Sequence, residues 1–131
     1  IHRPPATDHG FTDRFQPMTS RPALVAWFCL VLAAMLGVTG WASSEVALWK
    51  TPRAVATHPW FIATLFDAYF GFIAFWLWLA WREARVLPRA AWLVAILLLG
   101  NIAMAAYVLI ELWRLPPGSS ASSLFSRKPR P

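Results

Sequence analysis

The chain has 131 residues and a formal net charge of +6; 58% of its residues are hydrophobic and 14% are charged. With a mean hydropathy of +0.49, this composition excludes an ordinary soluble domain and predicts an all-α integral membrane protein with room for one small helical bundle. The single cysteine, Cys29, excludes an internal disulfide and a thiolate metal cluster. The positive net charge predicts contact with anionic lipid headgroups or an acidic partner. We expect no nucleic acid, because the basic residues are scattered over tails and loops.

Residues 1–22 are predicted to form an extended N-terminal arm. The segment holds four prolines and shows no helical period, and it lacks the apolar core of a secretory signal. Met18 is an alternative translation start. Arg3, Arg14 and Arg21 are candidates for contact with a partner subunit or with lipid headgroups.

The first predicted transmembrane span covers residues 23–41. Small residues recur along one face of this helix, a pattern that lets another helix approach closely in lipid. The alternative is the ordinary alanine and glycine content of a membrane span. The predicted packing face consists of Cys29, Ala33, Gly37 and Gly40.

Most of the nine tryptophans lie near the ends of the apolar runs. Indole rings favour the headgroup level of a bilayer, where the ring is buried and the N–H remains hydrated. The predicted interfacial belt consists of Trp41, Trp49, Trp60, Trp81 and Trp113.

The second predicted span, residues 60–81, is nearly all apolar, and its single formal charge is Asp67. Its 22 residues make a helix of about 33 Å, enough to cross a hydrocarbon core of about 30 Å. An ionised aspartate facing lipid costs a few kcal/mol, so we expect Asp67 to face protein, water or a partner. A hydrogen-bonded brace between helices is the favoured role; contact with a partner subunit and catalysis are the alternatives. Thr64 and Gly71 share its face of the helix.

The turn at residues 82–89 carries Arg82, Arg85 and Arg89 between two apolar runs. Positive loops face the cytoplasm, which predicts a cytoplasmic N-terminus and a periplasmic C-terminus in a bacterial inner membrane. In that arrangement six Lys/Arg residues lie on each side, so the orientation rests on this turn alone. The three turn arginines are also candidates for partner or lipid contact.

The third predicted span, residues 90–113, contains Asn101, Tyr107 and Glu111. In a continuous helix antiparallel to the second span, Tyr107 lies at the depth of Asp67 and donates to its carboxylate, while Asn101 lies deeper and braces helices. Residues 115–131, rich in proline and serine, are predicted to form an extended C-terminal tail. The transmembrane domain is therefore expected to cover residues 23–114.

Two stretches carry a family resemblance: HPWFIATLFDAYFGFIAFWLWLAWRE at 58–83 and LLGNIAMAAYVLIELWRLPPG at 98–118. They resemble a group of small bacterial three-helix membrane proteins of unknown function, over about residues 23–118. The resemblance implies the three-span fold and brings no activity with it. The acidic residue within an aromatic-rich span is more loosely similar to small integral-membrane terpene cyclases.

Two functional hypotheses follow. The first is a non-catalytic accessory or scaffold subunit of a larger membrane complex, such as a photosynthetic reaction centre–light-harvesting complex or a respiratory complex. It binds other membrane subunits and lipids and contacts lipid, quinone, carotenoid or chlorophyll tails, with no metal site. The second is a small membrane enzyme acting on an isoprenoid or lipid, with Asp67 as the acid and Glu111 or Tyr107 assisting. The lack of a catalytic motif favours the first.

Overall fold

The computed structural model describes residues 21–126 and residue 128, and every regular element in this part of the chain is helical. The predicted all-α class is confirmed. The arm residues Arg3, Arg14 and Met18 lie outside the described residues, as do Arg127 and residues 129–131. The elements are α1 (Arg21–Glu45), η2 (Leu48–Lys50), α2 (Arg53–Ala56), α3 (Pro59–Arg82), α4 (Val86–Leu99), α5 (Asn101–Arg114) and η3 (Ala121–Phe125).

Helices α1 and α3 are long and apolar enough to cross a membrane. They contain 25 and 24 residues, lengths of about 37 and 36 Å. None of the most apolar 18-residue window of α1, and only 6% of that of α3, is buried inside the protein. These helices therefore do not resemble the enclosed core helix of a soluble domain, whose apolar residues would be covered by the protein itself.

The start of α3 follows from local sequence. His58 occupies the N-cap position, and its ring Nδ1 accepts a hydrogen bond from the backbone N–H of Trp60 at 3.3 Å. Pro59 follows at the first helical position, where its fixed φ fits and its missing N–H costs nothing. The apolar run then continues without proline or a strained residue to Arg82.

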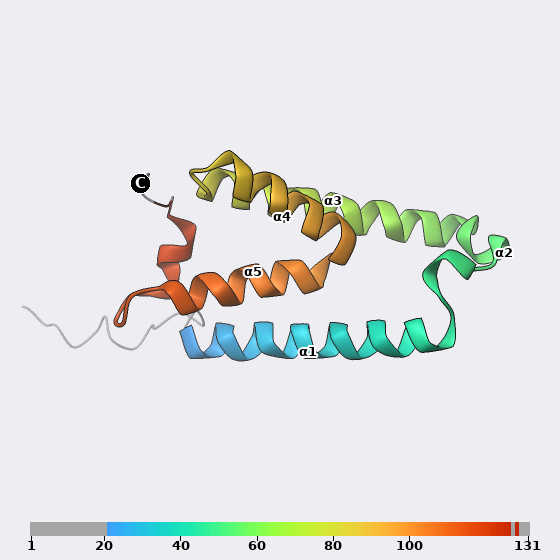
Figure 1. Ribbon diagram of the computed structural model, residues 1–131, viewed down its shortest axis with the longest axis horizontal. Coiled ribbons are helices and arrows are strands. Elements are labelled where there is room, and N and C mark those ends of the chain that lie inside the picture. The colour runs from blue at the N-terminus through green and yellow to red at the C-terminus, as the bar shows by residue number, and fades with distance from the viewer. Residues whose placement is uncertain (1–20, 127, 129–131) are drawn as a thin grey trace, which may run out of the picture.

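The prediction of a third continuous span at residues 90–113 is wrong, because the helix breaks at Gly100. Gly100 has φ +54° and ψ −125°, a backbone conformation that only glycine adopts without strain. The 14-residue helices on either side, α4 and α5, are each about 21 Å long, shorter than the hydrocarbon core. They form an antiparallel hairpin that reaches only part of the way along α3 (Figure 1).

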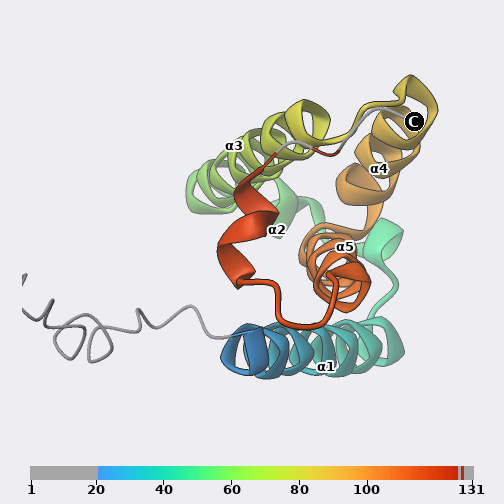
Figure 2. The same cartoon turned by 90° about the vertical axis from the view of Figure 1, so that its left-hand side faces the viewer.

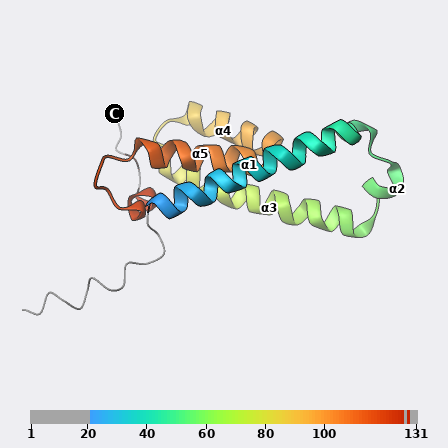
Figure 3. The ribbon, with the colours of Figure 1, turned by 90° about the horizontal axis from the view of Figure 1, so that it is seen from below.

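The helices pack in the spatial order α1, α5, then α3 and α4 (Figures 1 and 3). The core lies where α5 meets α3 and α4, around Leu79, Ile96, Tyr107 and Leu112, which are each no more than 1% exposed. The hairpin brings the end of α5 back to the start of α1, whereas a third continuous span would have carried it to the other end of the molecule. Arg21 and Trp113 line the same groove.

The predicted packing face of α1 meets no other helix within residues 21–126 and 128. Cys29, Ala33, Gly37 and Gly40 are exposed, and a Cβ added at either glycine would meet nothing within 4 Å. The half-buried side of α1 is instead a stripe of bulky residues at helical spacing, which packs on α5. This stripe consists of Leu24, Val25, Phe28, Val31, Leu32 and Met35.

Candidate functional site: a buried ion cluster and an adjoining apolar cavity

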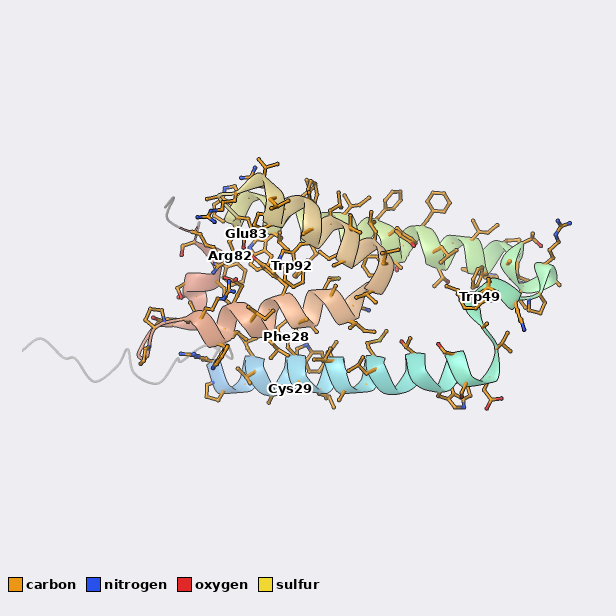
Figure 4. The ribbon with its side chains drawn as sticks, viewed as in Figure 1. Phe28, Cys29, Trp49, Arg82, Glu83 and Trp92 are labelled. Atoms are coloured by element: carbon orange, nitrogen blue, oxygen red, sulfur yellow. The ribbon has the colours of Figure 1, made fainter. Side chains whose placement is uncertain are left out.

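Charged side chains gather at the end of the molecule where α3 ends, α4 begins and α5 ends. We call Arg82, Glu83, Tyr107, Glu111 and Lys128 the ion cluster. Arg82, Glu83, Tyr107 and Glu111 are buried, and Lys128 is half-buried. Two cations and two carboxylates give the cluster no formal net charge, which lowers the cost of burying it. Figure 4 shows Arg82 and Glu83 at the opposite end of the molecule from Trp49.

Arg82 joins the end of α3 to α5 and to the C-terminal tail. Its Nη2 donates to Glu111 Oε2 at 2.9 Å. Its Nη1 donates to three backbone carbonyls of the tail, those of Ser123, Leu124 and Ser126, at 3.2, 2.5 and 3.0 Å. The planar fork of the guanidinium makes this simultaneous binding to two segments possible.

Lys128 connects the C-terminal tail to the other members of the cluster. Its Nζ donates to Glu83 Oε1 at 2.5 Å and to Glu111 Oε1 at 2.8 Å, and its backbone N–H donates to the carbonyl of Arg82 at 3.2 Å. The Tyr107 hydroxyl donates to the same Glu83 oxygen at 3.0 Å. Lysine is therefore a bridge between the two carboxylates, which would otherwise repel each other.

The turn between α3 and α4 is held by a second set of bonds. Arg89 donates from Nε and Nη2 to the carbonyl of Glu83, at 2.8 and 2.6 Å. The indole N–H of Trp76 donates to the carbonyl of Arg89 at 2.9 Å. Trp92 packs edge-on against the Tyr107 ring with centroids 5.1 Å apart, and Figure 4 shows it beneath α4, on the side of α5.

The cluster perturbs the pKa of Tyr107 and of Glu111 on α5, a helix too short to span a bilayer. Burial raises the pKa of Glu111, but hydrogen bonds from Lys128 and Arg82 outweigh this effect and hold the pKa below its ordinary value. Burial and the nearby Glu111 carboxylate raise the pKa of the Tyr107 phenol well above its usual range. Glu111 is therefore held as the carboxylate and Tyr107 as a hydrogen-bond donor. This arrangement favours a fixed brace and a docking point for the tail.

An apolar cavity of about 280 Å³ adjoins the cluster. Its walls come from α1, α3, α5 and η3, and Figure 2 shows the tail passing from the α1 side across to α3 beside α5. Trp78 belongs to this wall, and its Nε1 is buried and has no hydrogen-bond partner within the described ranges. The lining residues are Leu24, Phe28, Phe75, Trp78, Val108, Ala121, Leu124 and Phe125.

Asp67 does not meet Tyr107, contrary to the sequence prediction. Tyr107 lies beside Glu83, whereas Asp67 precedes Glu83 by 16 residues on a nearly continuous helix, about 24 Å along its axis. The physical reason is the break at Gly100, which returns Tyr107 to the charged end. The three side chains proposed for an enzyme are thus not brought together, because Glu111 also lies in the ion cluster.

Asp67 is exposed, and across residues 21–126 and 128 no hydrogen bond or ion pair reaches its carboxylate. The expected brace within the chain is therefore not formed. Its neighbour Thr64 donates to the carbonyl of Trp60 at 2.8 Å. Gly71 is exposed with open space around it, and Asn101 is exposed at the start of α5.

The predicted tryptophan belt divides between the two ends. Trp41, Trp49 and Trp60 are exposed at the end that holds α2, and Trp81 and Trp113 are exposed at the end that holds the ion cluster. Two groups of exposed tryptophans, one at each end of the long apolar helices, fit the two interfaces of a bilayer.

The candidate contact arginines have different surroundings. Arg82 and Arg89 bind within the protein, Arg85 is exposed, and half-buried Arg21 lines the groove beside Trp113. Within the described residues, no three His, Cys, Asp or Glu side chains gather as metal ligands would.

Sequence reasoning did not predict Glu83 or Lys128 as members of an internal cluster, and it treated Arg82 as an orientation marker and a candidate for partner or lipid contact. One pattern could have indicated that Glu111 is buried: it follows Tyr107 by four residues, on the face of α5 that also carries Val108 and Leu112. An acidic residue on an apolar helix face requires a buried partner.

A family model described as "Protein of unknown function (DUF1475)" matches residues 21–124. The match agrees with the resemblance to a family of unknown function and extends over α1 to α5 and all of η3 except Phe125. No curated protein and no solved structure matches the chain.

Proposed function

This chain belongs to the DUF1475 family of proteins of unknown function, and we propose that it is a non-catalytic subunit that packs against other helices of a larger membrane complex. In this proposal α1 and α3 cross a bacterial inner membrane, and the α4–α5 hairpin enters it from one side. Partner helices cover the parts of α1 and α3 that the hairpin does not reach. The host is a complex of several membrane subunits, with photosynthetic and respiratory complexes as the classes expected from sequence.

The observation that carries the proposal is the exposure of Asp67 on an apolar helix. Asp67 lies 15 residues before Arg82 and eight after Pro59, so it is about 22 Å and 12 Å from the two ends of α3. At such a depth an aspartate in contact with lipid costs about 3 kcal/mol. A hydrogen-bond donor on a partner helix would remove that cost.

The uncovered half of the molecule also supports a partner. The tip of the hairpin reaches α3 near Tyr69 and Phe72: the Tyr69 hydroxyl donates to the carbonyl of Leu97 at 3.4 Å, and Phe72 lies against Gly100. Before Tyr69, α3 presents large apolar side chains outward, with Phe66 59% exposed. The half of α1 beyond Met35 is likewise exposed. Exposed aromatic surface of this extent is typical of an interface with other helices or lipid.

We propose an orientation from the charges at the two ends. The end with the ion cluster carries more Lys/Arg residues than the end with α2, and the positive end of a membrane protein faces the cytoplasm. Both Arg21 and Arg114 belong to the positive end, so the N-terminal side of α1 and the tail share the cytoplasmic side. Among the described residues, the positive end holds Arg21, Arg82, Arg85, Arg89, Arg114 and Lys128, and the other end holds Lys50 and Arg53.

The test is purification of the tagged protein in a gentle detergent, followed by mass spectrometry of what co-migrates. We expect a stoichiometric complex with other membrane subunits, whose identities name the host. Asp67→Asn keeps a hydrogen-bonding group and should retain the complex, whereas Asp67→Leu should weaken it. Ser122→Leu, which adds the same side chain at an exposed position of η3, away from this surface, is the control and should leave the complex intact. A lone monomer or a homo-oligomer of the wild-type chain would contradict the proposal.

A further inference from the structure

The groove between α1 and α5 joins a charged end to an apolar wall. It has a volume of about 400 Å³, and on the α5 side its wall includes Leu109 and Trp113. On the α1 side the wall is Arg21, Val25 and Cys29, which follow one another at intervals of four residues and so form one line along the helix. Among the described residues of the lining, Arg21 alone is charged. The groove therefore runs along the helix axis from a cationic end into an apolar stretch.

The two parts of the groove lie at two depths of a bilayer that α1 crosses. Helix α1 begins at Arg21 and is about 37 Å long, whereas the hydrocarbon core is about 30 Å thick and each interfacial layer adds about 5–8 Å. Arg21 therefore lies at the headgroup level, which is also the level that the exposed indole of Trp113 favours. Cys29 follows Arg21 by eight residues, about 12 Å along the axis, and so lies at the level of the acyl chains.

Arg21 pairs with no carboxylate in the part of the chain that the structure describes. Every ion pair within residues 21–126 and 128 involves Glu83 or Glu111, and Arg21 is in none of them. Both glutamates are bound within the ion cluster. A guanidinium at the headgroup level attracts an anion from outside the chain, and phosphate is an anion that its planar fork of donors matches.

We propose that this groove binds an anionic phospholipid, with the phosphate on Arg21 and one acyl chain along Val25 and Cys29. A phospholipid carries its charge at the headgroup level and an apolar chain directly below, and the groove has the same two features at the same two depths. In a zwitterionic lipid, the cationic group beside the phosphate weakens the pairing with Arg21. The inference rests on α1 crossing a membrane, as proposed above, and does not require a partner subunit.

Native mass spectrometry of the full-length protein in detergent measures the preference for an anionic headgroup. The protein is titrated with phosphatidylglycerol or with phosphatidylcholine that has the same acyl chains. The wild-type protein should bind its first phosphatidylglycerol about fivefold more tightly, and Arg21→Gln should remove this preference. Arg85→Gln is the matched control, because it removes the same charge from an exposed residue at the same end of the molecule and should preserve the preference.

Cys29, the single cysteine of the chain, reports whether the lipid lies in the groove. Phosphatidylglycerol should slow the alkylation of Cys29 by N-ethylmaleimide about fivefold, and Arg21→Gln should reduce this protection to the level given by phosphatidylcholine. The control is Leu30→Cys in a Cys29→Ser background. Leu30 is 61% exposed and does not line the groove, so phosphatidylglycerol should not protect a thiol at this position.

Three results would overturn the proposal. The first is equal binding of the two lipids by the wild-type protein. The second is an equal loss of the preference in Arg21→Gln and Arg85→Gln, which would assign it to the overall positive charge of this end. The third is tight binding of phosphatidylglycerol that leaves the alkylation of Cys29 unchanged, which would place the lipid elsewhere.

These results are independent of the test of the subunit role. A lone monomer that binds phosphatidylglycerol through Arg21 would contradict the proposed subunit and support this site. A stoichiometric complex whose purified chain shows no such preference would support the subunit and contradict this site.

Discussion

Arg82 holds three segments together through one guanidinium. It lies at the end of α3, pairs with Glu111 of α5 and binds three carbonyls of the tail, and its side chain is about 6% exposed. A buried ion pair adds little over well-packed apolar residues, but removing one partner leaves the other charge buried and uncompensated. Replacing one charged member of the cluster should therefore destabilise the protein more than replacing the whole cluster with well-packed apolar residues.

Arg82→Met should destabilise the protein by about 3–5 kcal/mol and release the tail, because Glu111 and three carbonyls lose their donor. The midpoint of thermal unfolding in detergent measures the first effect, and protease cleavage near Ser126 measures the second. Arg85→Met, in the same turn but exposed, is the control and should change neither. Equal behaviour of the two variants would show that the cluster does not hold the tail.

Tail docking should weaken in acid. The folded pKa of Glu111 is lowered, so its contribution to stability is present above the ordinary glutamate pKa of about 4.5 and is lost as pH falls through the lowered value. Arg82, Lys128 and Arg114 face this carboxylate as cations, and Glu83 and Tyr107 complete its surroundings. Tail proteolysis measured from pH 7 to pH 3 should rise at the acid end. In Glu111→Gln the tail should be cleaved at every pH, with a flatter dependence; an unchanged pH profile in this variant would count against the assignment.

The ion cluster was not predictable as a unit from the sequence. Glu111 follows Arg82 by 29 residues and precedes Lys128 by 17 residues. Only the return of α5 brings the three side chains together. Asp67 is prominent because it is the single charge in a run of 22 mostly apolar residues, yet that prominence says nothing about where its partner lies. The expected role as an internal brace failed because the helix that should have carried the partner is too short to reach it.

At the scale of elements, one residue decides the architecture. The predicted spans 23–41 and 60–81 agree with α1 and α3 apart from a few residues at their ends, because long apolar runs without proline define such helices well. The run at residues 90–113 is equally apolar and was predicted as one helix. Glycine is common inside membrane helices, so Gly100 followed by Asn101 did not by itself indicate a break.

Replacing Gly100 should disturb the hairpin. A Cβ at this position would lie 2.7 Å from Cζ of Phe72, and the φ of +54° is unfavourable for alanine. We expect Gly100→Ala to cost about 1–3 kcal/mol in the thermal unfolding of the detergent-solubilised protein. Gly37→Ala, at an exposed helical glycine with open space, should be neutral or slightly stabilising. If both variants changed the thermal stability by the same small amount, the turn at Gly100 would not need glycine, which would contradict this account.

At the scale of the whole molecule, the break converts a three-span bundle into two long helices and a half-depth hairpin. With three spans, the sequence places six Lys/Arg residues on each side of the membrane. In the structure Arg114 and Lys128 lie instead at the end that holds Arg21 and Arg82, so the two counts are no longer equal. The same return leaves one half of α1 and α3 uncovered, with Asp67 in it. The proposed orientation and the proposed partner thus rest on one structural feature.

The most direct measurement is the side of the membrane on which the tail lies. In a Cys29→Ser background, Leu48→Cys, Val86→Cys and Ser122→Cys place single thiols at exposed positions in the α1–α2 connection, at the start of α4 and in η3. In cells with a permeabilised outer membrane, a membrane-impermeant maleimide should label Leu48→Cys, and label the other two only after the inner membrane is opened. Labelling of Ser122→Cys together with Leu48→Cys would mean that residues 86–114 cross the membrane as a third span and would contradict this account.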